Sequence, residues 1–424
     1  MILEDEYKLR RDTLVKSLSK NSLGVVFSAS DKIRSNDTEY PFRQNSNFYY
    51  LTGFKEENSI LVLIKKKSKI KTILFVQKKD KTLELWTGKK EGVKKAKKRF
   101  LVDEVFLVDE FEVKLKSYLK DARSLYYDFK IDDANTKTLM QHSKELYEYK
   151  NIAKKIALMR LIKSQTEIEL IKKAISITKE AHHSVMKMDK ISKNEMQIQA
   201  ELEYIFKKNM SYSDAYTSIV AGGNSANTLH YILNNKPLVE GELILIDAGC
   251  EYDYYASDIT RTIPVNGKFS NVQKEIYNLV LDVEKQIISM VKPNILKIDL
   301  HKKSEKLLVD GMIKLGILKG KRKKIIKTKK HKKYYPHGIG HWMGLDVHDE
   351  SPYMDKKGKE IPLQEGMVLT IEPALYFDKD DKSVPKEYRG IGIRIEDDAL
   401  VTKKGYENLS VDIVKSIEDI ESKK

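Results

Sequence analysis

Residues 245–262 read LIDAGCEYDYYASDITRT, and this stretch carries the pattern that decides the fold of the second half of the chain. Apolar and β-branched residues lead up to Asp247, and a second strand-like run, YYASDITRTIPV, follows. An antiparallel hairpin with its turn centred on Tyr252 and Asp253 would place Asp247 opposite Asp258. Two facing carboxylates repel each other and destabilise a sheet. The pattern therefore predicts a positive charge between them, with two solvated acids on an exposed hairpin as the alternative.

The composition is that of a soluble globular protein. The 424 residues suffice for two or three domains with cores of their own, and 41% of them are hydrophobic. The N-terminal residues are acidic where a signal peptide would be basic, and no apolar run approaches the ~18 residues of a membrane span. Cys250 is the single cysteine, which suits a reducing compartment. We therefore expect a cytoplasmic protein that makes no contact with a membrane.

Two regions that differ in their pattern of strand-like and helical runs indicate two domains. Residues 1–160 alternate strand-like runs (LGVVFSAS, SILVLIKK, KTILFVQKK, LYYDFKI) with helical runs, which is typical of an α/β domain. This region shows no catalytic cluster of its own. Ser164 and Glu167 have the spacing of a helix capping box, and an amphipathic run follows them. We expect a second domain over 161–424.

Three further stretches place metal-binding side chains beside strand-like or glycine-containing sequence. They are HGIGHWMGLDVHD (337–349), MVLTIEPALYF (367–377) and RGIGIRIEDDALV (389–401). Three glycines in the first stretch exclude a stable helix, so its histidines are not a helical zinc pair. In the third stretch, strand alternation sends Arg394 and Glu396 to the same face, away from the apolar layer.

Together these stretches supply four carboxylates and one imidazole, the ligand set of a dinuclear metal site: Asp247, Asp258, His341, Glu372 and Glu396. Four converging carboxylates without compensation would have strongly raised pKa values, and two divalent cations would neutralise them. Oxygen-rich sites with a single histidine suit Mn²⁺, whereas structural Zn²⁺ favours cysteine and histidine. We expect two divalent metal ions, with manganese as the first choice.

The order and flanks of these ligands resemble those of the pita-bread metallopeptidases, and within them the aminopeptidase P branch, the Xaa-Pro aminopeptidases. The resemblance covers nearly the whole chain, because EYPFRQNSNFYYLTGF (39–54), MRLIKS (159–164) and NTLHY (227–231) also resemble that family. It implies an α/β N-terminal domain and an α+β pita-bread catalytic domain. It also implies release of the first residue from peptides with proline in the second position, by a homo-oligomer that is a dimer or tetramer.

The resemblance assigns roles to the ligand positions. Asp247 and Asp258 would bind metal from the hairpin, and Asp258 and Glu396 would bridge both ions. His341 and Glu372 would complete one of the two metals. Glu372 would also act as general base and return the proton to the leaving nitrogen.

Four further residues match family positions that surround the metals. His230, His337 and His348 correspond to histidines that contact substrate and stabilise the oxyanion, His230 and His348 with catalytic roles. A hydrogen-bonded structural histidine is the alternative for each. Arg394 is implied to bind substrate or to orient a carboxylate or His348.

Two residues of the first domain are also implied. Asp37 would reach over from the first domain of its own or another subunit. Trp86 resembles an aromatic residue that reaches a neighbouring subunit's active site, with a half-buried core tryptophan as the alternative. In the second domain, YILNNKPL (231–238) departs from the acidic stretch usual in the family, which affects the substrate entrance.

The run KGKRKKIIKTKKHKK (319–333) contains ten lysine or arginine residues in fifteen, in a chain of formal net charge +16. We expect a solvated, disordered or helical lysine face there, rather than a nucleic-acid patch.

Three functions remain open on the sequence. They are a metalloaminopeptidase, an Xaa-Pro dipeptidase and a non-catalytic pita-bread binding protein. HWMG and GIGIRIEDD favour the aminopeptidase over the dipeptidase, and the complete ligand set argues against the binding protein.

Overall fold

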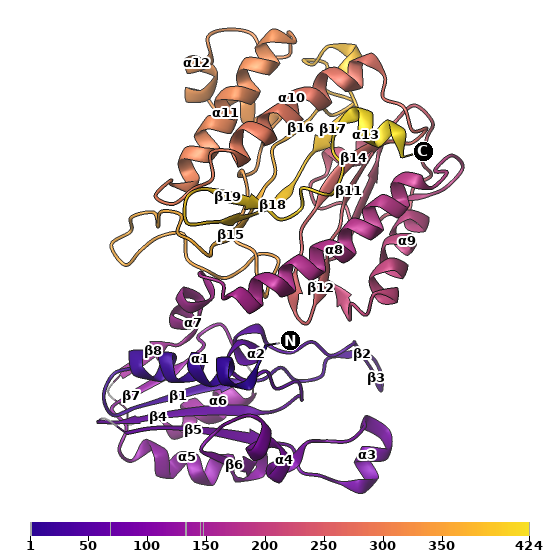
Figure 1. Ribbon diagram of the computed structural model, residues 1–424. Coiled ribbons are helices and arrows are strands. Elements are labelled where there is room, and N and C mark those ends of the chain that lie inside the picture. The colour runs from indigo at the N-terminus through magenta and orange to yellow at the C-terminus, as the bar shows by residue number, and fades with distance from the viewer. Residues whose placement is uncertain (1, 68, 132–133, 145, 147, 424) are drawn as a thin grey trace. The chain divides into compact units, whose positions relative to one another are not determined.

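The computed structural model describes residues 2–67, 69–131, 134–144, 146 and 148–423. The chain divides into two compact units, Met1–Met159 and Arg160–Lys424, one residue before the boundary expected from the sequence (Figure 1). Among the described helices, none combines the length and the apolar character needed to cross a membrane.

The N-terminal unit is built on a six-stranded mixed sheet of order β6-β5-β4-β1-β7-β8. Antiparallel pairing joins β5, β4 and β1, and parallel pairing adds β6 on one side and β7 and β8 on the other. The strands are β1 (Ser22–Phe27), β4 (Ile60–Lys66), β5 (Lys69–Val76), β6 (Glu104–Leu107), β7 (Ser124–Tyr127) and β8 (Glu148–Asn151), with a separate hairpin of β2 (Ile33–Ser35) and β3 (Thr38–Glu39). The helices are α1 (Glu4–Ser17), α2 (Ser46–Thr52), α3 (Lys81–Thr87), α4 (Gly92–Arg99), α5 (Phe111–Leu119), α6 (Ala134–His142) and α7 (Ala153–Arg160).

Hydrophobic runs form the central strands of this sheet, as the sequence predicted. All six residues of β1 are buried, and Leu23, Val25, Val62, Ile73 and Phe75 share one core cluster. The four predicted strand-like runs correspond to β1, β4, β5 and β7, with helices between β1 and β4 and between β5 and β7, whereas β4 and β5 form a hairpin. The predicted α/β class of this unit is therefore confirmed.

The C-terminal unit combines several small antiparallel sheets with long helices. The sheets have the orders β10-β11-β14, β13-β12-β9, β15-β18-β19 and β16-β17. The strands are β9 (Ser213–Asp214), β10 (Ile219–Gly222), β11 (Leu243–Asp247), β12 (Cys250–Tyr252), β13 (Tyr255–Ala256), β14 (Thr260–Pro264), β15 (Val368–Ile371), β16 (Ala374–Tyr376), β17 (Gly392–Arg394), β18 (Asp397–Val401) and β19 (Tyr406–Asn408). The helices are α8 (Gln165–Lys187), α9 (Glu195–Lys208), α10 (Asn271–Ile288), α11 (Lys297–Lys314), α12 (Arg322–Lys327) and α13 (Ile417–Ser422).

Two helix pairs support these strands. Helices α8 and α9 pack on each other and contact β12 and β10, whereas α10 packs on α11 and contacts β15 and β17. The predicted capping box begins α8, because the Ser164 hydroxyl accepts from the Glu167 amide at 3.3 Å and the Glu167 carboxylate accepts from the Ser164 amide at 2.9 Å.

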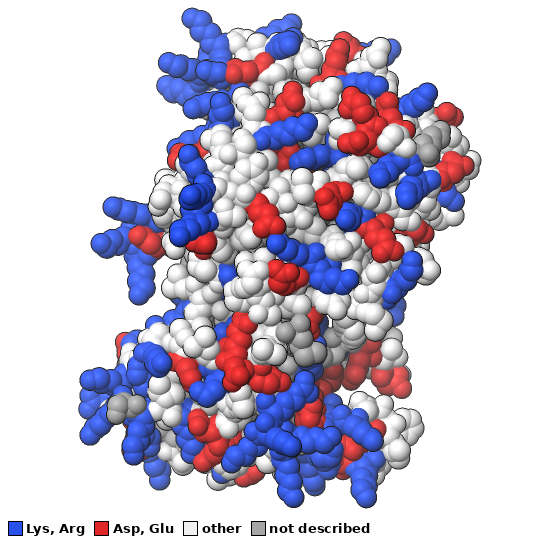
Figure 2. All heavy atoms as spheres, viewed as in Figure 1, with Lys and Arg blue, Asp and Glu red and all other residues white. Residues whose placement is uncertain are grey.

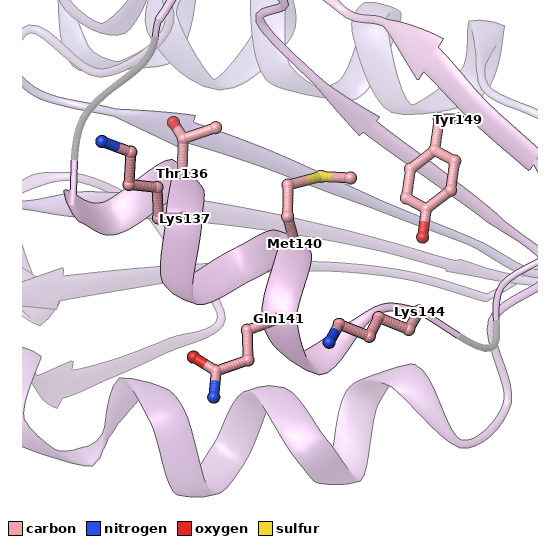
Figure 3. Close-up of a pocket in the computed structure, with 6 residues that line it drawn as sticks. All are labelled: Thr136, Lys137, Met140, Gln141, Lys144 and Tyr149. Atoms are coloured by element: carbon pink, nitrogen blue, oxygen red, sulfur yellow. The ribbon is translucent and has the colours of Figure 1, made fainter.

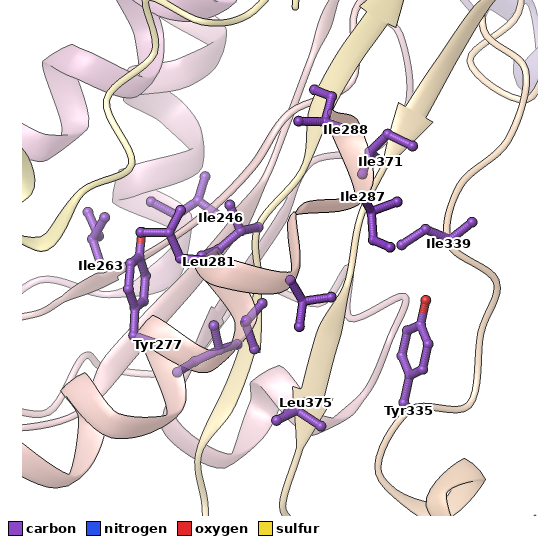
Figure 4. Close-up of a cluster of buried hydrophobic side chains, with 14 of the residues drawn as sticks. Ile246, Ile263, Tyr277, Leu281, Ile287, Ile288, Tyr335, Ile339, Ile371 and Leu375 are labelled. Atoms are coloured by element: carbon purple, nitrogen blue, oxygen red, sulfur yellow. The ribbon is translucent and has the colours of Figure 1, made fainter. Parts of the chain in front are cut away.

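The core lies between the strands and α10. Ile246 of β11 and Ile263 of β14 belong to the same buried cluster as Tyr277 and Leu281 of α10 (Figure 4). Each such aliphatic side chain stabilises the fold by about 1.5–3 kcal/mol. Because side chains alternate along a strand, the burial of Ile246 sends Asp247 to the opposite face. The core therefore fixes the face on which the acid projects.

Candidate metal and catalytic site

The predicted hairpin forms, but its register differs from the prediction. Asp247 pairs with Thr260, not with Asp258. The turn lies at Asp253 and Tyr254, whose φ values are 48° and 72°, one residue later than expected. Two positive φ values in a two-residue loop are those of a type I′ turn, whose twist matches that of the strands.

Asp258 still lies on the same face as Asp247, because a shift of two positions preserves the face of a strand. A hydroxyl joins the two acids. Tyr216 Oη lies 2.6 Å from Asp247 Oδ1 and 2.5 Å from Asp258 Oδ1. The sequence did not single out Tyr216, and only the fold brings it to the hairpin.

Gly249 explains how the two strands come so close at this point. A Cβ atom on Gly249 would lie 1.9 Å from the Ser257 carbonyl oxygen, so only glycine fits. The hydrogen bond from the Ser257 amide to the Cys250 carbonyl, at 3.0 Å, continues the ladder next to it. Steric crowding therefore explains why the sequence Asp247-Ala248-Gly249 ends in glycine.

The loop at 337–349 brings His341 to the hairpin. The His341 amide donates to Thr370 Oγ1 of β15 at 3.1 Å. Its Nδ1 donates to the Trp342 carbonyl at 3.1 Å, which leaves Nε2 facing the acids. Nε2 lies 3.3 Å from Asp258 Oδ2 and 4.0 Å from Glu372 Oε1. The predicted absence of a helix in this loop is confirmed, since the described residues 337–349 contain none.

The fourth acid, Glu396, comes from the segment between β17 and β18. Glu396 Oε2 accepts from Thr260 Oγ1 at 2.6 Å, and its amide donates to the Thr260 carbonyl at 3.1 Å. Arg394 projects to the same side, as predicted, and its Nη2 donates to Asp247 Oδ2 at 2.5 Å. This contact is with a carboxylate, one of the partners expected of Arg394, whereas the structure gives no contact between Arg394 and His348.

Electrostatics show that this cluster lacks positive charge. Burial and the Asp258 carboxylate raise the pKa of Asp247, against the charge of Arg394. Burial also raises the pKa of Glu372 to about 7 and, together with neighbouring carboxylates, holds the pKa of Glu396 well above its ordinary value. Burial lowers the pKa of His341, but the hydrogen bond and charge of Asp258 outweigh it and raise that pKa to about 9. Without a cation, these carboxyl groups would bind protons near neutral pH. A bound divalent cation would keep them ionised, because a nearby positive charge lowers the pKa of a carboxyl group.

The donor set therefore fits a metal site. One ligand atom each of Asp258, His341 and Glu396 lie within 4.8 Å of one another. Tyr216 links Asp247 to Asp258, because its hydroxyl is hydrogen-bonded to both carboxylates. Glu372 Oε1 lies 4.0 Å from His341 Nε2. All five predicted ligand residues are thus brought together.

The three surrounding histidines lie at different depths. His337 is partly buried, its Nδ1 donates to the Gly338 carbonyl at 2.8 Å, and its Nε2 lies 3.1 Å from Tyr376 Oη. Burial, then the charge of Arg394, lower its pKa to about 3, so the ring is neutral at pH 7. His348 is exposed, with its ring edge-on to His341 at 4.2 Å between centroids.

His230 is also exposed. The two exposed histidines can therefore contact a molecule that approaches the acids, whereas His337 has the partners of a fixed ring.

In the N-terminal unit, two of the predicted residues lie at the surface. Asp37 is exposed in the turn between β2 and β3. Trp86 of α3 is 85% exposed, so the alternative of a half-buried core tryptophan is wrong.

A pocket of about 560 Å³ lies beside α6 and β8 of this unit and is lined by Thr136, Lys137, Met140, Gln141, Lys144 and Tyr149 (Figure 3). These described lining residues include no carboxylate and no imidazole, so the pocket does not compete with the acid cluster as a site of metal chemistry.

The basic run forms α12 and a short 3₁₀ turn, Lys330–Lys333. Figure 2 shows lysine and arginine side chains gathered at the surface near α11 and α12. Ile325 and His331 are buried and anchor the run, while Lys321, Lys323 and Lys327 are exposed.

Comparison with known proteins places these features in a family. Residues 169–403 match the family model for metallopeptidase family M24, and residues 7–126 match that for the N-terminal domain of aminopeptidase P. An Xaa-Pro aminopeptidase of Haemophilus influenzae is 39% identical over 419 residues, which are 99% of this chain and 97% of that protein.

Solved structures agree. Aminopeptidase P of Escherichia coli with the inhibitor Pro-Leu matches with a TM-score of 0.96 and 36% identity, covering 100% of this chain and 98% of that one. A zinc-substituted form of the same enzyme in complex with product matches with a TM-score of 0.95, at the same identity and coverage. The predicted fold class, an α/β N-terminal domain with a pita-bread C-terminal domain, is confirmed.

Proposed function

Because this chain belongs to metallopeptidase family M24, we propose that it is an Xaa-Pro aminopeptidase, which hydrolyses the bond between a first residue and a following proline. The observation that carries the proposal is the grouping of Asp258, His341 and Glu396, which Asp247 and Glu372 adjoin through Tyr216 and His341, beside two exposed histidines. The function of the full-length relatives supports this activity over that of an Xaa-Pro dipeptidase. The complete ligand set argues against a non-catalytic binding protein.

We propose that the cluster holds two divalent cations, with Mn²⁺ as the native metal. The raised pKa values of Asp247, Glu372 and Glu396 support a site that needs cations, and its single imidazole among oxygen donors favours manganese. A zinc-substituted relative supports metal dependence. When bound, the two ions lower the pKa of a water so that it serves as a nucleophile near neutral pH.

The residues of the cluster divide the work. Asp258 and Glu396 would hold the ions together with Asp247, His341 and Glu372. Glu372 would take the proton of the attacking water and return it to the leaving nitrogen, because an amide nitrogen leaves only when it is protonated.

The neighbouring polar residues bind substrate. His230 and His348, both exposed, donate to the oxyanion and contact the proline. His337 stays neutral and contacts substrate through the face that its bonds to Gly338 and Tyr376 leave open. Arg394 holds Asp247 in place and so fixes the position of the substrate's amine.

We further propose the setting of this activity. The catalytic domain spans 161–424, and the domain 1–160 supports a homo-oligomer, a dimer or tetramer. The exposed Trp86 supports a contact with another subunit. The substrates are peptides with proline in the second position in the cytoplasm, and neither nucleic acid nor a membrane is expected as a partner.

A peptide panel tests the function. We expect the Mn²⁺-loaded protein to release arginine from Arg-Pro-Pro with a higher kcat/KM than from Arg-Ala-Pro or Arg-Pro. A preference for Arg-Ala-Pro would reject the proline specificity, and a preference for Arg-Pro would identify a dipeptidase.

The Asp258→Asn variant tests the metal site. It should abolish turnover and lower the metal content from about two ions per chain, because the amide loses the charge and one coordinating oxygen. Asp253→Asn in the hairpin turn is the matched control and should keep both. Full activity of Asp258→Asn would refute the dinuclear mechanism.

A further inference from the structure

The N-terminal half of α11 carries a second set of charged side chains, and its first residue lies close to the acid cluster. Lys297, His301 and Glu305 are four positions apart, so they lie on one face of the helix. Charge interactions link Lys297 with Glu372, and His301 with Lys297. This face of α11 therefore borders the catalytic region.

Most of the positive charge on this face is already compensated. Glu305 Oε1 lies 2.8 Å from His331 Nε2, 3.0 Å from Lys332 Nζ and 3.3 Å from His301 Nε2. Burial lowers the pKa of His301 to about 4, so that ring is neutral at pH 7. The charge of Lys332 is therefore balanced by Glu305, which also contacts His301 and His331.

Lys297 differs from these neighbours. Its Nζ lies 4.9 Å from the centre of the Tyr353 ring, and that ring stacks on Trp342, next to His341, at 5.4 Å and 16°. A Cβ atom on Gly338, beside His337, would lie 4.0 Å from the same Nζ. Among the residues that the structure describes, no carboxylate oxygen comes within 4.0 Å of it, although Glu372 and Glu360 act on it from further away.

A partly buried ammonium without a close counterion is well suited to bind an anion that arrives with the substrate. Every unmodified peptide carries one negative group whatever its side chains are, and this group is the C-terminal carboxylate. In an Xaa-Pro-Yaa tripeptide this group lies two residues beyond the attacked carbonyl, at ~3.3–3.6 Å per extended residue.

We propose that Lys297 is a specificity-determining residue that binds the C-terminal carboxylate of Xaa-Pro-Yaa tripeptides and so directs the enzyme toward short peptides. The inference rests on the proposed Xaa-Pro aminopeptidase function. The ring of Tyr353 faces the Lys297 ammonium group, and Glu305 on the same helix is already compensated by His331, Lys332 and His301.

The experiment compares free and amidated C-termini. We would measure kcat and KM for Arg-Pro-Pro and for its C-terminal amide, with the Mn²⁺-loaded wild-type protein and the Lys297→Met and Lys297→Arg variants. Lys303→Met, an exposed lysine of the same helix, is the control. Calorimetric binding of Pro-Leu and of Pro-Leu amide adds a readout that needs no turnover.

We expect the wild-type protein to favour the acid over the amide by about tenfold, through KM and not kcat, as for one charge-assisted contact at a partly exposed site. Lys297→Met should remove this preference, so that acid and amide have equal KM, while Lys297→Arg and Lys303→Met should keep it. The binding of Pro-Leu should follow the same pattern.

Equal cleavage of acid and amide by the wild-type protein would overturn the role of Lys297 without touching the proposed function, and this result needs no variant to fold. A preference retained by Lys297→Met would overturn it as well. Absence of cleavage of both peptides would instead reject the proposed function, and the binding of Pro-Leu against its amide would then decide the role of Lys297.

Discussion

At the level of single residues, the hydroxyl of the partly buried Tyr216 links Asp247 and Asp258. Tyr216→Phe removes that hydroxyl and keeps the ring. We expect the affinity for Mn²⁺ to fall by about 10- to 100-fold, as for loss of a group that orients metal ligands. Titration calorimetry measures this, with Tyr212→Phe, an exposed neighbour, as control. An unchanged affinity would show that the hydroxyl does not orient the acids.

The sequence predicted the acids and His341 but not their partners, and the reason is physical. The acids occur in runs whose spacing and flanks are unusual for a surface, so they can be recognised one by one. Tyr216 and Thr260 have ordinary chemistry, and they acquire a role only because the fold brings their hydroxyls to carboxylates 31 and 136 positions away in the chain.

At the level of elements, the close approach of the hairpin strands depends on Gly249. A methyl group there would overlap the Ser257 carbonyl oxygen. We expect Gly249→Ala to lower the free energy of unfolding by about 2 kcal/mol or more and to reduce metal binding. Gly405→Ala is the matched control, because its Cβ would meet nothing within 4 Å, and it should stay within about 0.5 kcal/mol of the wild type. Urea denaturation distinguishes the two, and equal stabilities would show that the strands can separate without loss.

The register error belongs to this level too. A type I′ turn is usually indicated by Asn-Gly or Asp-Gly, and here it consists of Asp253 and Tyr254, a pair that gives no such signal. The strands β6 and β8 were also not predicted, because EVFL and EYKN are short and only partly buried. Long apolar runs such as β4 were found because their burial is continuous. The error in register left the functional inference intact, since it moved Asp258 along its face of the strand and not to the other face.

At the level of the whole molecule, stability should depend on pH and on metal through the acid cluster. Burial raises the pKa of Glu372 from 4.5 to about 7, so the folded protein binds a proton more tightly there than the unfolded chain does. Such a group contributes stability that is fully present below the unfolded pKa and is lost as the pH rises through the folded one. We expect the free energy of unfolding of the chelated protein to fall as the pH rises from about 4.5 to about 7.

Thermal unfolding of the chelated protein over this pH interval tests the prediction. The Glu372→Gln variant should show a smaller decrease, because its amide does not ionise. Added Mn²⁺ should restore stability at the upper end of the interval by binding the folded state alone. A chelated wild-type protein that becomes more stable between these pH values would contradict the assignment.

The type I′ hairpin also determines when the site can be assembled. Asp247 and Asp258 are close in the chain, so their pairing requires closing only a short loop and can occur early. His341 and Glu396 follow Asp258 by 83 and 138 positions. During synthesis, when N-terminal segments emerge first, the acid pair therefore forms before the other ligand residues of the site have been made. On the proposed function, metal binding would mark the completion of folding, and a nascent chain that stops between the hairpin and β15 carries an acid pair without the other ligands of the site.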